Sequence, residues 1–88
     1  MSGVVSVYPN PFTETTTIKF SMPEDDHVSI DVYDISGKLI ETIFNSDVSA
    51  EQKYTVEFSG STLPSGMYFY RMTTNSDVYS GKMMLLKE

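Results

Sequence analysis

Residue types that commonly carry chemistry are sparse in this sequence of 88 residues. Cysteine is absent and His27 is the single histidine, which excludes a thiol nucleophile, a disulfide and a multi-histidine metal site. Serines are common, but none lies in the Gly-x-Ser-x-Gly pattern of a nucleophile elbow. We therefore expect His27 to be a solvated strand residue and the protein not to be an enzyme.

The carboxylates give no clearer sign of a site. The run Glu24-Asp25-Asp26 lacks the spaced oxygen ligands of a calcium loop, so we interpret it as a solvated acidic loop. Asp31, Asp34 and Glu57 could supply paired carboxylates for glycoside cleavage only if a short chain also formed a sizeable cleft. No metal and no cofactor is predicted.

Charge and length limit the classes of partner. Six Lys or Arg residues stand against twelve Asp or Glu residues, a formal net charge of -6, which argues against binding to nucleic acid or to an anionic membrane surface. No stretch approaches the roughly 20 apolar residues of a membrane span. Residues 1–3 read as an added start, and residues 4–88 as a single domain.

The hydrophobic pattern alternates with a period of two along most of the chain, which is typical of strands with one buried face. It predicts strands over 4–8, 15–20, 28–33, 38–44, 54–58, 66–73 and 78–87, with a polar loop over 45–52. Seven short strands with turn signals between them predict an all-β protein, a seven-stranded immunoglobulin-like (Greek-key) β-sandwich.

Two turns can be predicted in more detail. Asp34 can accept a backbone amide and Gly37 can take a positive φ, which together favour a tight hairpin turn. The order Leu63, Gly66, Tyr68 is typical of a tyrosine corner. We expect Tyr68 to be buried, with its hydroxyl bonded to the backbone near Leu63.

The last two predicted strands carry more apolar side chains than one face can bury. If Tyr68 points inward, then Phe69 and Arg71 point outward. The run Met83-Met84-Leu85-Leu86 must likewise present two side chains to each face, so either a neighbouring segment or a partner covers the outer pair. We expect a terminal edge strand with unpaired backbone groups and self-association through it.

Four motifs in this order resemble one family: Tyr8-Pro9-Asn10-Pro11-Phe12, Asp31 to Gly37, Ser65 to Tyr68, and the Lys-flanked apolar ending. The chain resembles the type A C-terminal sorting domains of the type IX secretion system of Bacteroidetes, the Por secretion tail family. The resemblance implies a secretion signal that follows an N-terminal cargo domain, is recognised by the outer-membrane translocon and is usually removed by a surface sortase. It also implies the periplasm in transit, and then the cell surface or the medium, as the location.

The resemblance places translocon recognition chiefly in the last strands. The candidate residues are Gly66, Tyr68, Phe69, Arg71, Lys82, Met83, Met84, Leu85, Leu86 and Lys87, and the structural ones are Tyr68, Leu63, Gly37 and Asp34. Many members carry a Gly in the loop where this chain has Ala50 to Lys53. The alternative is an accessory carbohydrate-binding or adhesive module that stacks sugars on Phe69, Tyr33 or Tyr79.

Overall fold

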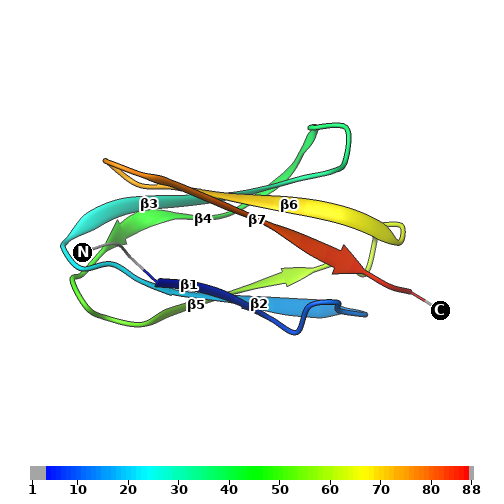
Figure 1. The fold of residues 1–88 in the computed structure, drawn as a ribbon, viewed down its shortest axis with the longest axis horizontal. Helices are drawn as coiled ribbons and strands as arrows, with labels where there is room; N and C mark the ends of the chain where they lie inside the picture. The colour runs from blue at the N-terminus through cyan, green and yellow to red at the C-terminus, as the bar shows by residue number, and fades with distance from the viewer. Residues whose placement is uncertain (1–3, 88) are drawn as a thin grey trace.

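The computed structural model describes residues 4–87, and its strands follow the predicted order (Figure 1). The elements are β1 (Val4–Tyr8), β2 (Thr15–Ser21), β3 (Asp26–Tyr33), β4 (Leu39–Val48), β5 (Tyr54–Ser59), β6 (Gly66–Thr73) and β7 (Val78–Leu85). In β2, β3 and β6 the buried residues stand at alternate positions, as the period-two pattern predicts.

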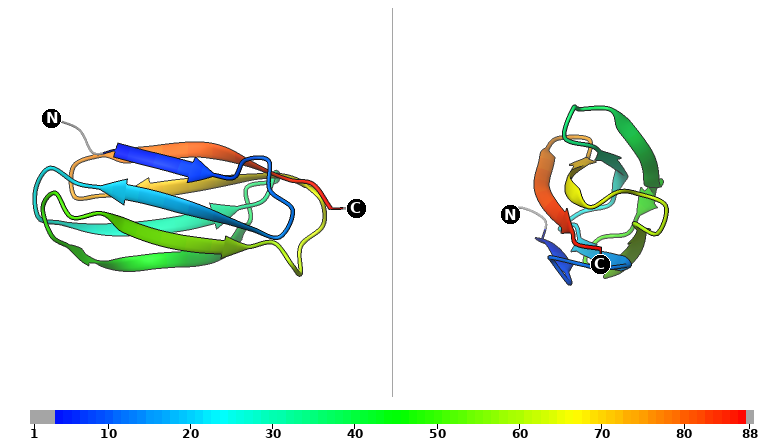
Figure 2. Two further views of the ribbon diagram at one scale, coloured as in Figure 1. Left: turned by 90° about the horizontal axis from the view of Figure 1, so that it is seen from below. Right: turned by 90° about the vertical axis from the view of Figure 1, so that its right-hand side faces the viewer.

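The strands form two antiparallel sheets that face each other, as Figures 1 and 2 show. One sheet has the order β1-β2-β5 and the other the order β4-β3-β6-β7. The predicted immunoglobulin-like β-sandwich is thus confirmed. β7 is an edge strand of the larger sheet, and β1, the corresponding edge of the smaller sheet, lies on the same side of the molecule (Figure 2).

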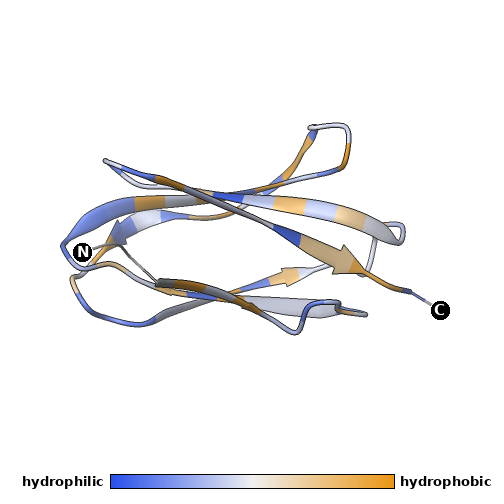
Figure 3. Ribbon diagram, in the orientation of Figure 1, coloured by the Kyte–Doolittle hydropathy of each residue, from blue (hydrophilic) through white to orange (hydrophobic). Residues whose placement is uncertain are grey.

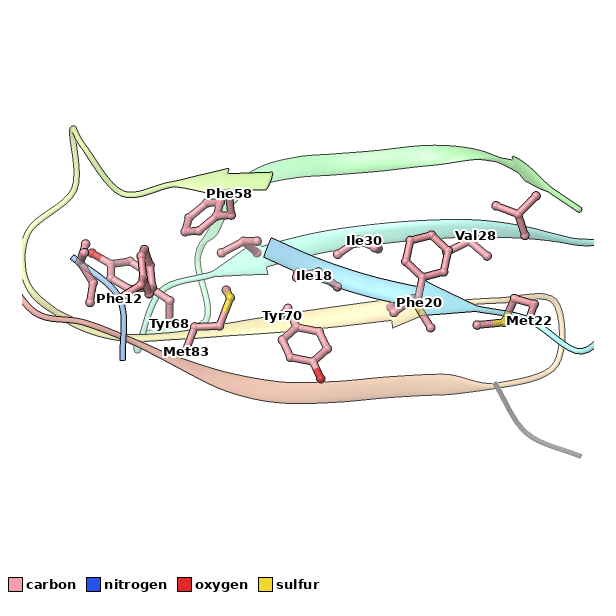
Figure 4. Packing of buried hydrophobic residues seen from close by; sticks show 14 residues of the cluster. Phe12, Ile18, Phe20, Met22, Val28, Ile30, Phe58, Tyr68, Tyr70 and Met83 are labelled. Atoms are coloured by element: carbon pink, nitrogen blue, oxygen red, sulfur yellow. The ribbon is translucent and has the colours of Figure 1, made fainter. Parts of the chain in front are cut away.

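The core fills the space between the sheets with the inward side chains of both (Figure 4). Aromatic rings supply much of its volume: Phe12 meets Phe58 edge to face at 6.2 Å between ring centroids, and Phe20 stacks on Tyr54 at 5.5 Å. Such rings give a short chain a large buried area. The buried hydrophobic residues are Phe12, Ile18, Phe20, Met22, Val28, Ile30, Val32, Val48, Phe58, Tyr68, Tyr70, Met72, Met83 and Leu85.

The boundaries of β4 correct the sequence prediction. The sequence predicts a loop from residue 45, but β4 continues through the polar residues 45–47 to the buried Val48 and pairs with β3 as far as Asp26. Pairing with β3 overrides the weak local strand signal of these polar residues. Two register shifts, at Ile30/Asp31 and at Val32/Tyr33, disturb the alternation that sequence reasoning relies on. β7 ends at Leu85, two residues earlier than predicted.

The turn between β3 and β4 has the predicted form. The Asp34 carboxylate accepts the amides of Ser36 at 2.9 Å and Lys38 at 3.0 Å and the Ser36 hydroxyl at 2.7 Å. Gly37 has a φ of 87°, the left-handed conformation that favours glycine. The Ser36 hydroxyl, followed by the Lys38 amide, lowers the pKa of Asp34 because these bonds stabilise its charged form.

Candidate recognition surface

The β6–β7 hairpin separates the predicted recognition residues into an inner and an outer face. Tyr68 and Met83 are register partners, and both are buried in the core, as is Leu85. The outer face holds the pairs Phe69–Lys82 and Met67–Met84. Only the residues on the outer face can contact a partner while the domain remains folded.

The outer face of the larger sheet carries a continuous row of side chains across four strands. Leu39, Tyr33, Phe69 and Lys82 are successive register partners from β4 to β7. Arg71 lies in the next row, and its guanidinium carbon is 5.4 Å from the centroid of the Tyr33 ring, within range of a cation–π contact. The surface therefore combines apolar area with two cationic side chains.

A shallow depression of about 470 Å³ lies on this face beside the β3–β4 turn. Its lining includes Tyr33, Ile35, Phe69, Arg71 and Ser80. Tyr79, the third aromatic residue proposed for sugar stacking, faces the other way and packs against the core. The three aromatic side chains therefore do not form one platform.

The tyrosine corner that precedes β6 anchors this hairpin. The Tyr68 hydroxyl donates a hydrogen bond of 2.7 Å to the carbonyl oxygen of Pro64, next to the expected Leu63. Tyr68 is 4% exposed, and Leu63 packs against the core. Burial raises the pKa of the Tyr68 hydroxyl, with a smaller contribution from the Asp34 carboxylate. Gly66 opens β6 with a φ of 155°.

One contact was missed by the sequence analysis: the segment Pro9–Phe12 lies along the outer edge of β7. We call this segment the strap. The Phe12 amide donates to the carbonyl of Met84 and the Leu86 amide donates to the carbonyl of Phe12, both at 2.9 Å. Phe12 thereby forms a parallel bridge to Leu85.

The Asn10 side chain extends the same contact by bonding to backbone groups of β7. Its amide nitrogen donates to the carbonyl of Lys82 at 2.8 Å, and its oxygen accepts the amide of Met84 at 3.0 Å. The prediction that the end of the terminal strand offers unpaired backbone groups is therefore wrong between Lys82 and Leu86. The sequence contains Asn10 between Pro9 and Pro11, but nothing local to it indicates a partner more than 70 residues away.

Comparison with known proteins agrees with this architecture. A model of the "secretion system C-terminal sorting domain" family matches residues 6–86. The chain belongs to this family. A sorting domain of this kind is a non-catalytic signal at the C-terminus of type IX cargo, which is recognised by the secretion machinery and secreted across the outer membrane.

A solved structure shows the same fold as this sorting domain. The chain resembles part of the "dimeric latent PorU" of Porphyromonas gingivalis, with a TM-score of 0.74 and 19% identity. The match covers 98% of the present chain and 9% of that one. No curated protein sequence matches the chain.

The C-terminal end of the sorting domain is also held by hydrogen bonds to the β5–β6 loop. The Lys87 amide donates to the Ser65 hydroxyl at 2.8 Å, and its ammonium group donates to the Ser61 carbonyl at 2.8 Å. Lys87 is a predicted recognition residue, but its ammonium group is engaged in this hydrogen bond to the β5–β6 loop. Leu86 is 49% exposed, while Arg71 and Lys82 are also exposed.

The opposite end of the sorting domain carries the acidic loops. Asp25 accepts the amide of Ala50 at 2.8 Å, and Asp26 accepts the amide of Asn75 at 3.0 Å, so these carboxylates connect loops. Within residues 4–87 no group of three or more His, Asp or Glu side chains could hold a metal ion. The same residues contain no helix long and apolar enough to cross a membrane.

His27 lies beside these loops with both ring nitrogens engaged. Nδ1 is 2.8 Å from a carboxylate oxygen of Asp47, and Nε2 is 2.6 Å from the side-chain oxygen of Asn45. The Asp47 contact, followed by the Asn45 contact, raises the pKa of His27 because both oxygens favour the doubly protonated ring. The residue is exposed, as the sequence predicted.

Proposed function

We propose that the outer-membrane translocon recognises this sorting domain through the outer face of β6 and β7. The observation that supports the proposal is the separation of the hairpin into two faces. Tyr68, Met83 and Leu85 are committed to the core. The candidate residues that remain available are Phe69, Arg71, Lys82 and Met84 on the outer face, together with the exposed Leu86 just after β7.

The chemistry of this face suits a protein partner. Phe69 and Met84 offer apolar area on this face. The hydrophobic colour at the C-terminal end of β7 in Figure 3 belongs to both faces, because this stretch also carries the buried Met83 and Leu85. Arg71 and Lys82 add positive charge in a protein whose formal net charge is -6. A complementary surface would therefore be apolar with acidic groups around it, since opposite potentials across an interface favour encounter and orientation.

The arrangement of the strands also suits a signal that follows a cargo domain. β1 begins at the end of the molecule opposite to the end of β7 (Figure 1). A cargo joined before β1 would therefore lie away from the C-terminal end of β7, where Met84 and Leu86 are found. In this proposal the domain passes through the periplasm with its cargo and is removed by the sortase at the cell surface.

The proposal can be tested with residues 4–88 fused behind a signal peptide and a fluorescent reporter in a Bacteroidetes host that has the secretion system. We expect the unmodified fusion to reach the cell surface or the medium, and the Arg71→Glu, Lys82→Glu variant to remain in the periplasm. The matched control is Lys19→Glu, Lys53→Glu, which makes the same charge change at an exposed residue of β2 in the other sheet and at an exposed residue of the loop just before β5.

Two results would contradict the proposal. If the unmodified fusion stays in the periplasm, residues 4–88 are not a sufficient signal. If the two charge-reversed variants are exported equally well, the outer face of β6 and β7 is not the recognition surface. Circular dichroism of each purified domain must first show that the variant is folded.

A further inference from the structure

The outer edge of β7 has two halves with different surroundings. In an antiparallel pair, alternate residues direct their amide and carbonyl groups toward the partner strand or away from it. The strap bonds to Lys82, Met84 and Leu86, so these residues face away from β6. The same alternation directs the backbone groups of Val78 and Ser80 to that side.

The half from Lys82 to Leu86 is closed by the strap, and its two contacts differ in strength. Phe12 is 1% exposed and is fixed in the core against Phe58. Asn10 is exposed, and it holds β7 only by two side-chain hydrogen bonds at the surface. Water can replace such bonds at little cost, so Asn10 is the part of the strap that another segment can displace.

In the other half, the outward backbone groups of Val78 and Ser80 are not covered by any segment within residues 4–87. Val78 is 63% exposed and Ser80 is exposed, and within the described part of the chain no hydrogen bond reaches the outward backbone groups of either residue. An edge with unpaired amides and carbonyls is a template for strand addition. The strap itself shows that this edge accepts an extended segment in a defined register.

We propose that the edge of β7 is a strand-addition site for an extended segment of the secretion machinery, and that Asn10 gates it. The incoming segment pairs first with Val78 and Ser80 and then takes the place of Asn10 on Lys82 and Met84. Lys82 stands at the junction of the two halves, and its side chain lies on the outer face of β6 and β7. This inference rests on the proposed function and adds main-chain pairing to it.

Ser80 offers a variant that tests the edge without disturbing the sheet. Because its amide faces away from β6, Ser80→Pro removes an edge donor and places a ring in the path of an added strand, while the bonds between β6 and β7 remain. Ser80→Ala removes the same hydroxyl and keeps the amide, so it is the matched control. We expect the Pro variant of the reporter fusion to lose export and the Ala variant to keep it.

The role of Asn10 as a gate can be tested separately, by hydrogen exchange in the isolated domain. Asn10→Ala removes the acceptor of the Met84 amide, so we expect hydrogen exchange at Met84 to become faster while exchange at Leu86, which is bonded to Phe12, changes much less. Asn75→Ala is the control, since the contact of Asn75 is made by its backbone amide. Unchanged exchange at Met84 in Asn10→Ala would overturn the gate.

The export assay separates this inference from the proposed function. Suppose that the folded Ser80→Pro variant is exported to the same extent as Ser80→Ala, while the Arg71→Glu, Lys82→Glu variant is retained in the periplasm. Strand addition is then overturned, and the proposal that the outer face is recognised still stands. Sedimentation of the isolated domain tests whether a second copy of the chain, rather than the secretion machinery, occupies the edge of β7. If the protein self-associates, Ser80→Pro abolishes that association and export is unaffected, the edge serves a second copy of the chain, and the inference fails.

Discussion

The Tyr68 hydroxyl illustrates how one residue links the sequence pattern to the recognition hairpin. It is buried at the start of β6 and satisfies the carbonyl of Pro64. A buried polar group that loses its partner keeps its desolvation penalty, so the bond matters more for what its absence would cost than for its own strength. The corner thus fixes where β6 begins and which residues of β6 point outward.

We expect Tyr68→Phe to lower the free energy of unfolding by about 1 to 2 kcal/mol, because it leaves the Pro64 carbonyl without its donor. Tyr54→Phe is the matched control, since the Tyr54 hydroxyl accepts the Ser49 amide at an exposed site where water can replace it. Urea denaturation of both variants measures the difference. Equal losses would mean that burial of the Tyr68 bond carries no special weight.

His27 provides a test of the electrostatics at the acidic end. Its pKa is raised above the ordinary value of 6.5, chiefly by Asp47. Because the folded pKa exceeds the unfolded one, the resulting stabilisation is fully present below pH 6.5 and is lost as the pH rises through the folded pKa. In an NMR titration we expect His27 to titrate above 6.5 and Asp47→Asn to return it toward that value.

Asp77→Asn is the control for the His27 titration, because it removes a carboxylate from the neighbouring β6–β7 turn without touching the imidazole contacts. A shift of the His27 pKa in Asp77→Asn as large as that in Asp47→Asn would show that general negative charge, rather than the Asp47 contact, raises it.

At the scale of elements, the strands that alternate cleanly could be predicted nearly to their ends, whereas the irregular β4 could be predicted only over 38–44. β3 has Val28, Ile30 and Val32 buried in strict alternation, and β6 has Tyr68, Tyr70 and Met72. In β4 the two register shifts break the alternation, and its polar residues 45–47 are strand only because β3 pairs with them. Local sequence carries no record of that pairing.

The strap was beyond sequence reasoning for a different physical reason. Its contacts join Asn10 and Phe12 to residues 72 or more positions later, and one partner in each Asn10 contact is a backbone group with no sequence signature. The apolar run 83–86 predicts that a neighbouring segment or a partner covers its outward side chains. The strap covers something else, the backbone edge between Lys82 and Leu86, and the Leu86 side chain stays 49% exposed.

For the molecule as a whole, stability and recognition share one strand but use different residues. Met83 and Leu85 have no exposed area, so removing the terminal residues 83–88 would open the core as well as remove the outer face. Loss of export by such a truncation would therefore not distinguish an unfolded domain from a missing address. Point substitutions on the two faces of β7 can distinguish them.

We expect Met84→Lys with Leu86→Lys to change the free energy of unfolding by roughly 1 kcal/mol or less, because both side chains lie outside the core, and yet to block export of the reporter. The opposite pattern is expected on the inner face. Met83→Ala is expected to cost about 2 to 5 kcal/mol by leaving a cavity, and to permit export at a temperature where the domain is still folded.

Urea denaturation measures the stability of each variant, and the fraction of the reporter at the cell surface measures its export. Both are measured on the same variants, so the two effects can be compared directly. If export declines in proportion to stability whichever face is changed, the translocon reads the folded sandwich as a whole. If export instead follows the outer face, the fold serves to present it. In that case the buried residues of β7 contribute to secretion only by holding Lys82 in register with Phe69 and Met84 in register with Met67 on the outer face.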